Sequence, residues 1–288
     1  MRFPTRSSSG CPGSGICPTS SPEPPSTRPS RRSSTACPWS LTVADRRYAV
    51  ISGASSGIGA ATAVRLADDG WDVTIGARRE DRLREVAARS GARAFALDVT
   101  DPASADPFCD RIDDCALLVL SAGGALGLDA IAEADEDDWQ QMWQVNVMGS
   151  LRLIQRLLPK LVQSGSGHII LLGSIAGRQP YVGGGGYNAV KFAVRAMRDV
   201  LRLELLGQPV RVTEIAPGMV KTPFSEVRFK GDRARAAAVY QGVDALLPED
   251  IAECIAWVAS RPPHVAIEQL VVQPLQQADA RTVHGPDE

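Results

Sequence analysis

The chain has 288 residues, of which 44% are hydrophobic and 22% are charged, with a formal net charge of −2. This is the composition of a globular protein, and the length suits one large α/β domain or two small ones. The nearly balanced charge gives no reason to expect nucleic acid or an anionic membrane as partner, and no apolar run approaches the roughly 18 residues of a membrane-spanning helix.

The first 44 residues differ from the rest of the chain. They contain five arginines, no lysine and a single acid, Glu23, among many Ser, Pro, Thr and Gly residues. Such a segment cannot bury enough apolar surface to fold, so we expect residues 1–44 to be disordered. Its composition also suits a transit peptide or an upstream start codon chosen wrongly. We expect the folded domain over 45–280 and a flexible C-terminus over 281–288.

The six cysteines include no CxxC pair and have no nearby His cluster. This spacing argues against a metal site and against a disulfide framework. We therefore expect reduced thiols in a cytoplasmic protein.

From residue 48 onward, short apolar runs alternate with helical patterns. Strands are expected at 48–52, 72–77, 93–99, 116–122, 168–174, 211–217 and 269–274, and helices at, among others, 57–69, 80–90, 136–164 and 186–206. Apolar runs without alternation predict strands buried on both faces, and their alternation with helices predicts right-handed crossovers. The sequence therefore predicts a single doubly wound α/β domain of the Rossmann type, with a seven-stranded parallel sheet flanked by helices.

The first strand leads directly into the glycine-rich stretch SGASSGIG at 52–59, and a helical pattern follows. Gly53, Gly57 and Gly59 allow a tight turn and a close approach of the backbone to a phosphate, and the helix N-terminus supplies N–H groups. A plain turn is the alternative. The strand–turn–helix context favours a dinucleotide-binding loop.

The second strand ends in Ala77-Arg78-Arg79, at the place where an NAD site needs a carboxylate for the ribose 2′-hydroxyl. Two guanidinium groups suit a 2′-phosphate instead, so the sequence predicts NADP as cofactor. Two solvated arginines at the start of a helix are the alternative. Asp98, after the third strand, is placed to meet the adenine or to cap the helix that begins near Pro102.

Tyr187 and Lys191 stand four residues apart in a helical pattern and therefore share one face. A neighbouring ammonium lowers the pKa of a phenol, which predicts a general acid/base near neutral pH. Ser174, at the end of the fifth strand, can hydrogen-bond a substrate carbonyl. Asn146 lies in a long helix where asparagine is unfavourable, which indicates a buried hydrogen-bond network. Taken singly, each residue also has a structural explanation as a surface pair, a turn or a packing contact.

Together these motifs resemble the short-chain dehydrogenase/reductase family over about residues 47–275. SGASSGIG is similar to its TGxxxGxG loop, YNAVK at 187–191 to its YxxxK motif, and PGMVKT at 217–222 to the segment covering the nicotinamide. Ser174 and Asn146 match its catalytic serine and asparagine. Two departures are Ser52, where the family has Thr, and Leu120-Ser121-Ala122-Gly123, where it usually has Asn-Asn-Ala-Gly.

The resemblance implies a homotetramer and the catalytic residues Asn146, Ser174, Tyr187 and Lys191. The residues expected to bind the cofactor are Ser52, Gly53, Ser55, Ser56, Gly57, Ile58, Gly59, Arg78, Arg79, Asp98, Val99, Ala122, Gly123, Tyr187, Lys191, Pro217, Gly218, Val220 and Thr222.

The segments 224–232, 245–265 and 273–278 resemble the NADP-dependent 3-hydroxy acid dehydrogenases within this family. This implies a short hydroxy acid such as serine, allo-threonine or 3-hydroxypropionate, bound by Ser174, Tyr187 and Arg228. Arg228 is the candidate ligand of the carboxylate, with Lys221 and Arg178 behind it, although an interface or surface salt bridge would also explain it. A ketoreductase of larger polyketide-like or antibiotic intermediates, and a non-catalytic NADP sensor, are the alternatives.

Four glycines, 183–186, precede Tyr187. We expect them to let the active-site loop pass close to the substrate and swing over it, the alternative being a turn that tolerates glycine.

Overall fold

The computed structural model describes residues 47–284. The predicted tail at 1–44 lies outside the described residues, and the predicted C-terminal segment 281–288 is described only as far as residue 284. All seven predicted strands are present and pair in parallel in the order β3-β2-β1-β4-β5-β6-β7. They are β1 (Arg47–Ser52), β2 (Trp71–Ala77), β3 (Arg93–Ala96), β4 (Leu117–Leu120), β5 (Gly167–Leu172), β6 (Val210–Pro217) and β7 (Gln269–Val272).

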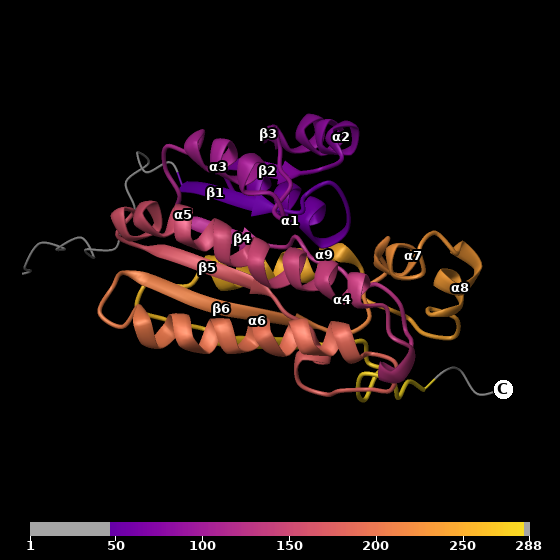
Figure 1. Ribbon diagram of the computed structural model, residues 1–288. Helices are drawn as coiled ribbons and strands as arrows, with labels where there is room; N and C mark the ends of the chain where they lie inside the picture. Colours follow the sequence, from indigo (N-terminus) through magenta and orange to yellow (C-terminus); the bar gives the residue numbers. More distant parts are fainter. Residues whose placement is uncertain (1–46, 285–288) are drawn as a thin grey trace, which may run out of the picture. The chain divides into compact units, whose positions relative to one another are not determined.

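Helices cover both faces of this sheet (Figure 1). One face packs against α1 (Gly57–Asp68), α2 (Glu80–Ser90) and α9 (Pro248–Ala259), through a core that includes Leu66, Leu83 and Ile251. The other face packs against α3 (Pro102–Asp110), α5 (Gly149–Gln163) and α6 (Gly185–Glu204), through Phe108, Leu153 and Val194. The strands between the two cores are largely apolar, and β4 is entirely so, with four buried residues. The doubly wound Rossmann-type fold predicted from the sequence is confirmed.

The strand order reverses direction between β1 and β4. In such sheets the crevice for a ligand opens outside the carboxyl ends of the strands, at this switch point. The glycine-rich stretch 52–59 follows β1, and the stretch 121–124 follows β4, so both meet there. Two short helices, α7 (Phe224–Arg228) and α8 (Arg233–Ala238), lie beyond this end of the sheet (Figure 1).

The prediction of one long helix over 136–164 is wrong in one respect, because a π-helical segment, Gln144–Met148, interrupts the α-helix. The regular parts are α4 (Glu136–Trp143) and α5. At the centre of the segment, the side-chain amide of Asn146 donates to the carbonyl oxygen of Met142 at 2.8 Å. That oxygen would accept from the backbone N–H of residue 146 in a regular α-helix, so the side chain competes for it. Such bulges are frequent at functional sites.

Four strands end earlier than predicted, namely β3, β4, β5 and β7. The difference matters at Ser174, because β5 ends at Leu172. Ser174 instead caps the 3₁₀ turn Ile175–Gly177, and its Oγ accepts from the backbone N–H of Ala176 at 3.1 Å. The residue therefore sits on the loop that leaves the sheet and enters the crevice. None of the helices between residues 47 and 284 is long and apolar enough to cross a membrane.

Candidate active site

The glycines of the loop after β1 are required by close packing. Gly53 has φ of +71°, and a Cβ there would lie 2.6 Å from the backbone nitrogen of Ala122. A Cβ on Gly59 would lie 2.6 Å from the carbonyl oxygen of Gly53. Ser56, at the N-cap of α1, makes no side-chain cap hydrogen bond, so the first-turn N–H groups remain available to an anion. The loop therefore has the geometry of a phosphate cradle.

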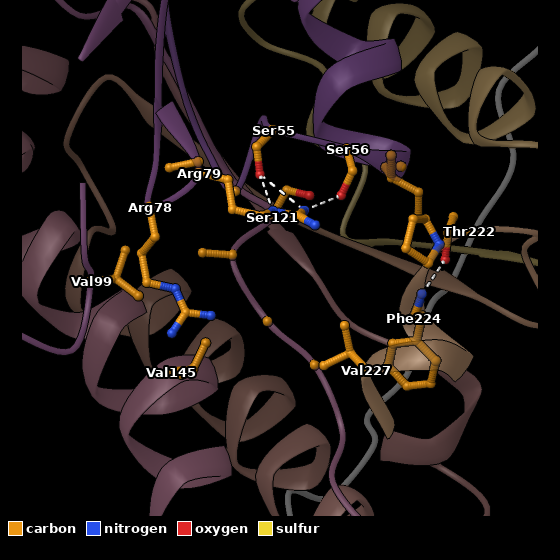
Figure 2. A pocket seen from close by; sticks show the side chains of 18 of the residues that line it. Ser55, Ser56, Arg78, Arg79, Val99, Ser121, Val145, Thr222, Phe224 and Val227 are labelled. Atoms are coloured by element: carbon orange, nitrogen blue, oxygen red, sulfur yellow. Dashed lines mark hydrogen bonds between the residues drawn. The ribbon is translucent and has the colours of Figure 1, made fainter. Parts of the chain in front are cut away.

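A cavity of about 340 Å³ extends from this loop to the ends of β2 and β3. Its lining includes Gly53, Ser55, Ser56, Gly57, Ile58, Arg78, Arg79, Asp98, Val99, Ala122, Gly123 and Thr222, all expected to bind the cofactor. Figure 2 shows the two arginines turned in different directions. Arg79 donates to the hydroxyl of Ser55 at 3.1 Å and to that of Ser56 at 2.6 Å, whereas Arg78 reaches past Val99 toward Val145.

Arg79 is therefore the cation held over the phosphate loop, and Arg78 extends along the wall where the adenosine part of a dinucleotide would lie. This arrangement fits a group with a phosphate near the end of β2, since both guanidiniums line one cavity. The cavity is also lined by Ser121, Val145 and Phe224, which the sequence interpretation did not assign to the cofactor site.

Asp98 lines the same cavity. Partial burial alone would raise the pKa of its carboxyl group, but hydrogen bonds from the backbone and the hydroxyl of Thr100 hold the pKa below its usual value. The alternative role of capping the next helix falls to Asp101, whose Oδ1 accepts from the N–H of Ala103 at 2.9 Å. Asp98 is thus an ionised acceptor at the far end of the cavity.

Two residues expected to bind the cofactor do not line either cavity of the crevice. Ser52 is 1% exposed, and its hydroxyl accepts from the N–H of Ala122 at 3.3 Å. Gly59 packs against Gly53 instead. Both residues shape the loop from behind, because they hold the ends of β1 and β4 together. Leu120, one of the departures from the family pattern, is buried in the apolar core beneath them.

A second cavity, of about 420 Å³, adjoins the first and shares with it Ile58, Gly123, Leu172 and Thr222, among others. Ser174, Tyr187 and Lys191 line it, together with Pro217, Gly218 and Val220 of the segment expected to cover the nicotinamide. The crevice therefore runs from the arginines at the end of β2 to the catalytic candidates.

Tyr187 and Lys191 lie on the first turns of α6. The Nζ of Lys191 lies 5.7 Å from the centre of the Tyr187 ring and donates to the carbonyl oxygen of Leu172 at 2.8 Å. Burial lowers the pKa of Lys191 to about 8. Burial also raises the pKa of Tyr187 above its usual value, while Ser174 and Arg228 act in the opposite direction.

The expectation that the pKa of Tyr187 lies below its ordinary value is therefore wrong. Desolvation outweighs the neighbouring charges, because it disfavours the phenolate. At neutral pH the phenol keeps its proton, so it is available as a proton donor.

Asn146 does not line the cavities but supports them from beneath. Its side-chain amide donates to the carbonyl oxygen of Gly124 at 3.0 Å, and its Oδ1 accepts from the N–H of Gly124 at 3.3 Å. A Cβ on Gly123 would lie 2.7 Å from this oxygen and 3.5 Å from the Nζ of Lys191. Asn146 thus fixes the loop that separates it from Lys191, the candidate catalytic lysine.

The three cations considered for a substrate carboxylate have different surroundings. Arg178 forms an ion pair with the buried carboxylate of Glu214 at 2.9 Å. Lys221 is exposed and lines neither cavity of the crevice. Arg228 lines the second cavity, and its Nη2 is buried and has no hydrogen-bond partner in the described part of the chain. The Nε of Arg178 is also buried without a hydrogen-bond partner among the described residues, but Arg178 lines neither cavity. Of the three, Arg228 therefore combines an unpartnered donor with a place on the cavity wall.

Arg228 is held in place by two contacts. Its Nε donates to the carbonyl oxygen of Gly127 at 2.9 Å, and its Nη1 donates to the hydroxyl of Tyr181 at 3.0 Å. The guanidinium carbon also lies 5.8 Å from the centre of the Tyr187 ring. The sequence did not identify Tyr181, which follows Gln179-Pro180 on an irregular loop and belongs to no motif.

The glycine run 183–186 has a packing role that the sequence interpretation did not assign. Gly183 has φ of +75°, and Gly185 and Gly186 already belong to α6. Side chains in place of the last two would collide with Trp139 and Met142 of α4. The run therefore brings the start of α6 against α4 and fixes the position of Tyr187.

Residues 47–233 match the family model described as short chain dehydrogenase. The chain belongs to the short-chain dehydrogenase/reductase family, as its motifs predict, and is an oxidoreductase of that family. This finding favours an enzyme over a non-catalytic sensor.

Two related proteins and one solved structure show which members of the family this chain resembles. An uncharacterized oxidoreductase of Mycobacterium tuberculosis is 50% identical over 235 residues, covering 82% of this chain and 94% of that protein. The NADP-dependent 3-hydroxy acid dehydrogenase YdfG of Escherichia coli K12 is 38% identical over 238 residues, with 80% and 96% covered. A solved structure, the closed form of serine dehydrogenase complexed with NADP⁺, has a TM-score of 0.79 at 36% identity, with 83% and 100% covered. The chain is thus related to the NADP-dependent 3-hydroxy acid dehydrogenases.

Proposed function

We propose that this protein is an NADP(H)-dependent oxidoreductase of a short 3-hydroxy acid, such as serine, allo-threonine or 3-hydroxypropionate, or of the corresponding semialdehyde. The observation that carries the proposal is the Nη2 of Arg228 beside Tyr187, a buried donor that has no hydrogen-bond partner within residues 47–284. An unpaired buried donor costs free energy, and a carboxylate is the group that a guanidinium binds best.

The choice of NADP rests on the end of β2. Arg79 is fixed by two serine hydroxyls, and Arg78 lines the same cavity without a carboxylate at the position that NAD needs. The names of the relatives agree, since YdfG and the serine dehydrogenase structure both carry NADP in their descriptions. When bound, the nicotinamide supplies or accepts the hydride.

The chain's own residues handle the proton and the orientation of the substrate. Tyr187 donates its proton to a carbonyl oxygen in reduction and takes it back from the hydroxyl in oxidation. Ser174, on the same cavity wall, orients that oxygen with its hydroxyl. Lys191 keeps a positive charge near the phenol below a pH of about 8. Arg228 holds the carboxylate at the other end of a short substrate.

We also propose a homotetramer in the cytoplasm. Support for the assembly comes from apolar side chains exposed on α6, where Phe192 is 40%, Val200 is 49% and Leu203 is 76% exposed. Exposed apolar surface on a helix favours contact with a partner.

The experiment that tests the proposed activity is a panel of alcohols supplied with NADP⁺ or NAD⁺, followed by absorbance of the reduced nicotinamide. Short 3-hydroxy acids should be oxidised with NADP⁺, and uncharged alcohols of the same size should react much more slowly. Faster oxidation of large uncharged alcohols would favour the ketoreductase alternative and contradict the proposal.

A further inference from the structure

The charges that line the substrate cavity are all of one sign. Its charged lining residues are Lys191, Arg228 and Arg281, and none of its lining residues is Asp or Glu. The proposed function uses Lys191 at the reacting end and Arg228 for one carboxylate. Arg281 is a cation that this function leaves unused.

Arg281 is carried by a hairpin that folds back over the cavity. Gln277 forms an antiparallel bridge with Val283, and the N–H of Ala278 donates to the carbonyl oxygen of Thr282 at 3.0 Å. The hairpin is anchored at its base, because the side-chain oxygen of Gln277, a residue 6% exposed, accepts from the N–H of Met219 at 2.8 Å. The backbone that carries Arg281 is therefore anchored to the segment expected to cover the nicotinamide, and the Arg281 side chain is exposed at the cavity.

The acid nearest in sequence does not neutralise this arginine. Asp279 is occupied within the turn, where its Oδ1 accepts from the N–H groups of Arg281 and Thr282 at 2.8 and 2.7 Å, and its Oδ2 from the Thr282 hydroxyl at 2.9 Å. These bonds hold the pKa of Asp279 below its usual value, so the carboxylate stays ionised and engaged with the turn. Within residues 47–284, the guanidinium of Arg281 has no ion-pair partner.

Arg281 and Arg228 share one aromatic ring. Their guanidinium carbons lie 5.5 and 5.6 Å from the centre of the Tyr181 ring, respectively. Two cations near one ring repel each other, although Arg281 is exposed and solvent screens part of that repulsion. The ring face of Tyr181 attracts both guanidiniums. A ligand with two acid groups would bind both cations at once and remove the repulsion.

We propose that Arg281 binds a second acidic group, so that the preferred substrate is a 3-hydroxy acid with two anionic ends and its hydroxyl-bearing carbon between them. This inference rests on the proposed function, in which Arg228 holds the first carboxylate. Arg281 is then the residue that selects dianionic over monoanionic hydroxy acids.

The test compares 3-hydroxybutyrate with 3-hydroxyglutarate, which differ only in a second carboxylate. The wild-type kcat/KM should favour 3-hydroxyglutarate. Arg281→Ala should lower kcat/KM for 3-hydroxyglutarate at least about tenfold, mainly through KM, and leave 3-hydroxybutyrate nearly unchanged, since truncation removes one charge pair. Calorimetry should show binding of glutarate, which cannot react, weakened by a similar factor.

Arg235 gives a matched control. It is exposed and lies over the ring of Phe229, which lines the cavity, but Arg235 itself does not. Arg235→Ala should leave both substrates unaffected. If the wild type oxidises 3-hydroxybutyrate, two results would overturn this inference and leave the proposed function intact. One is a wild type with no preference for 3-hydroxyglutarate, and the other is an equal loss on both substrates in Arg281→Ala. Failure to oxidise either hydroxy acid would overturn the proposed function, and the inference with it.

Discussion

Lys191 places its Nζ 5.7 Å from the centre of the Tyr187 ring, and burial shifts the two pKa values in opposite directions. The lysine becomes easier to deprotonate and the tyrosine harder. This pair is the part of the site on which the proposed chemistry depends most directly.

Tyr187→Phe should abolish most turnover while leaving the dissociation constant of NADP nearly unchanged. The variant keeps the ring that packs 5.3 Å from Phe224 and removes only the hydroxyl. Loss of a general acid/base group costs roughly 10²- to 10⁴-fold in rate. Steady-state kinetics and a cofactor titration measure the two quantities, and wild-type turnover in the variant would rule out this role for the phenol.

The lowered pKa of Lys191 predicts that the free energy of unfolding depends on pH. Its pKa is about 8 in the folded protein, against an ordinary value of 10.5. Between these values the unfolded chain binds more protons than the folded one, so this lysine makes the free energy of unfolding rise with pH. The tyrosine contributes in the opposite direction only above its ordinary value of 10, because its folded pKa is raised.

The measurement is urea unfolding of wild type and Lys191→Met at about pH 7.5 and about pH 9.5. From the lower to the higher pH, the wild type should gain stability relative to the variant, which has no group to titrate at this position. The same pH dependence in both proteins would mean that folding does not lower the pKa of Lys191.

Cofactor choice should follow the two arginines at the end of β2. Replacing Arg78 and Arg79 with Ala should weaken the binding of NADP roughly tenfold or more and leave the binding of NAD little changed, because only NADP carries the 2′-phosphate. Arg82→Ala is the matched control, since Arg82 is exposed on α2, where it pairs with Glu85. Equal losses for NADP and NAD would show that these arginines do not read that phosphate.

The proposed homotetramer can be tested by measuring the molecular mass of the protein in solution. Light scattering should give four times the mass of one chain, and Leu203→Lys on the exposed face of α6 should reduce that mass, because a charge would be buried in the contact. A wild-type mass equal to one chain would exclude the tetramer.

The fold and the catalytic candidates could be predicted because their signals are local. The apolar runs of the strands and the spacing of Tyr187 and Lys191 are contiguous in sequence, and the glycines of the phosphate loop follow a strand directly. The π-helical segment at Asn146 was missed because the sequence does not show that this side chain takes the Met142 carbonyl oxygen while it also reaches Gly124 across the fold. Tyr181 and Arg281 were missed for the same reason, since only the folded chain brings their loops to one cavity.

The direction of the Tyr187 pKa shift also required the structure. Spacing shows that an ammonium is near, but burial decides which effect is larger. The role of the glycine run is similar, because the sequence shows flexibility and only the packing against Trp139 shows why no side chain fits.

The central claim, that Arg228 binds the carboxylate of a short hydroxy acid, is tested most directly by kcat/KM of wild type and Arg228→Ala with 3-hydroxypropionate and with 1-propanol, each with NADP⁺. The wild type should prefer the acid, and the variant should lose at least about tenfold on the acid while changing little on the alcohol. Equal oxidation of acid and alcohol by the wild type, or equal losses on both in the variant, would contradict the account.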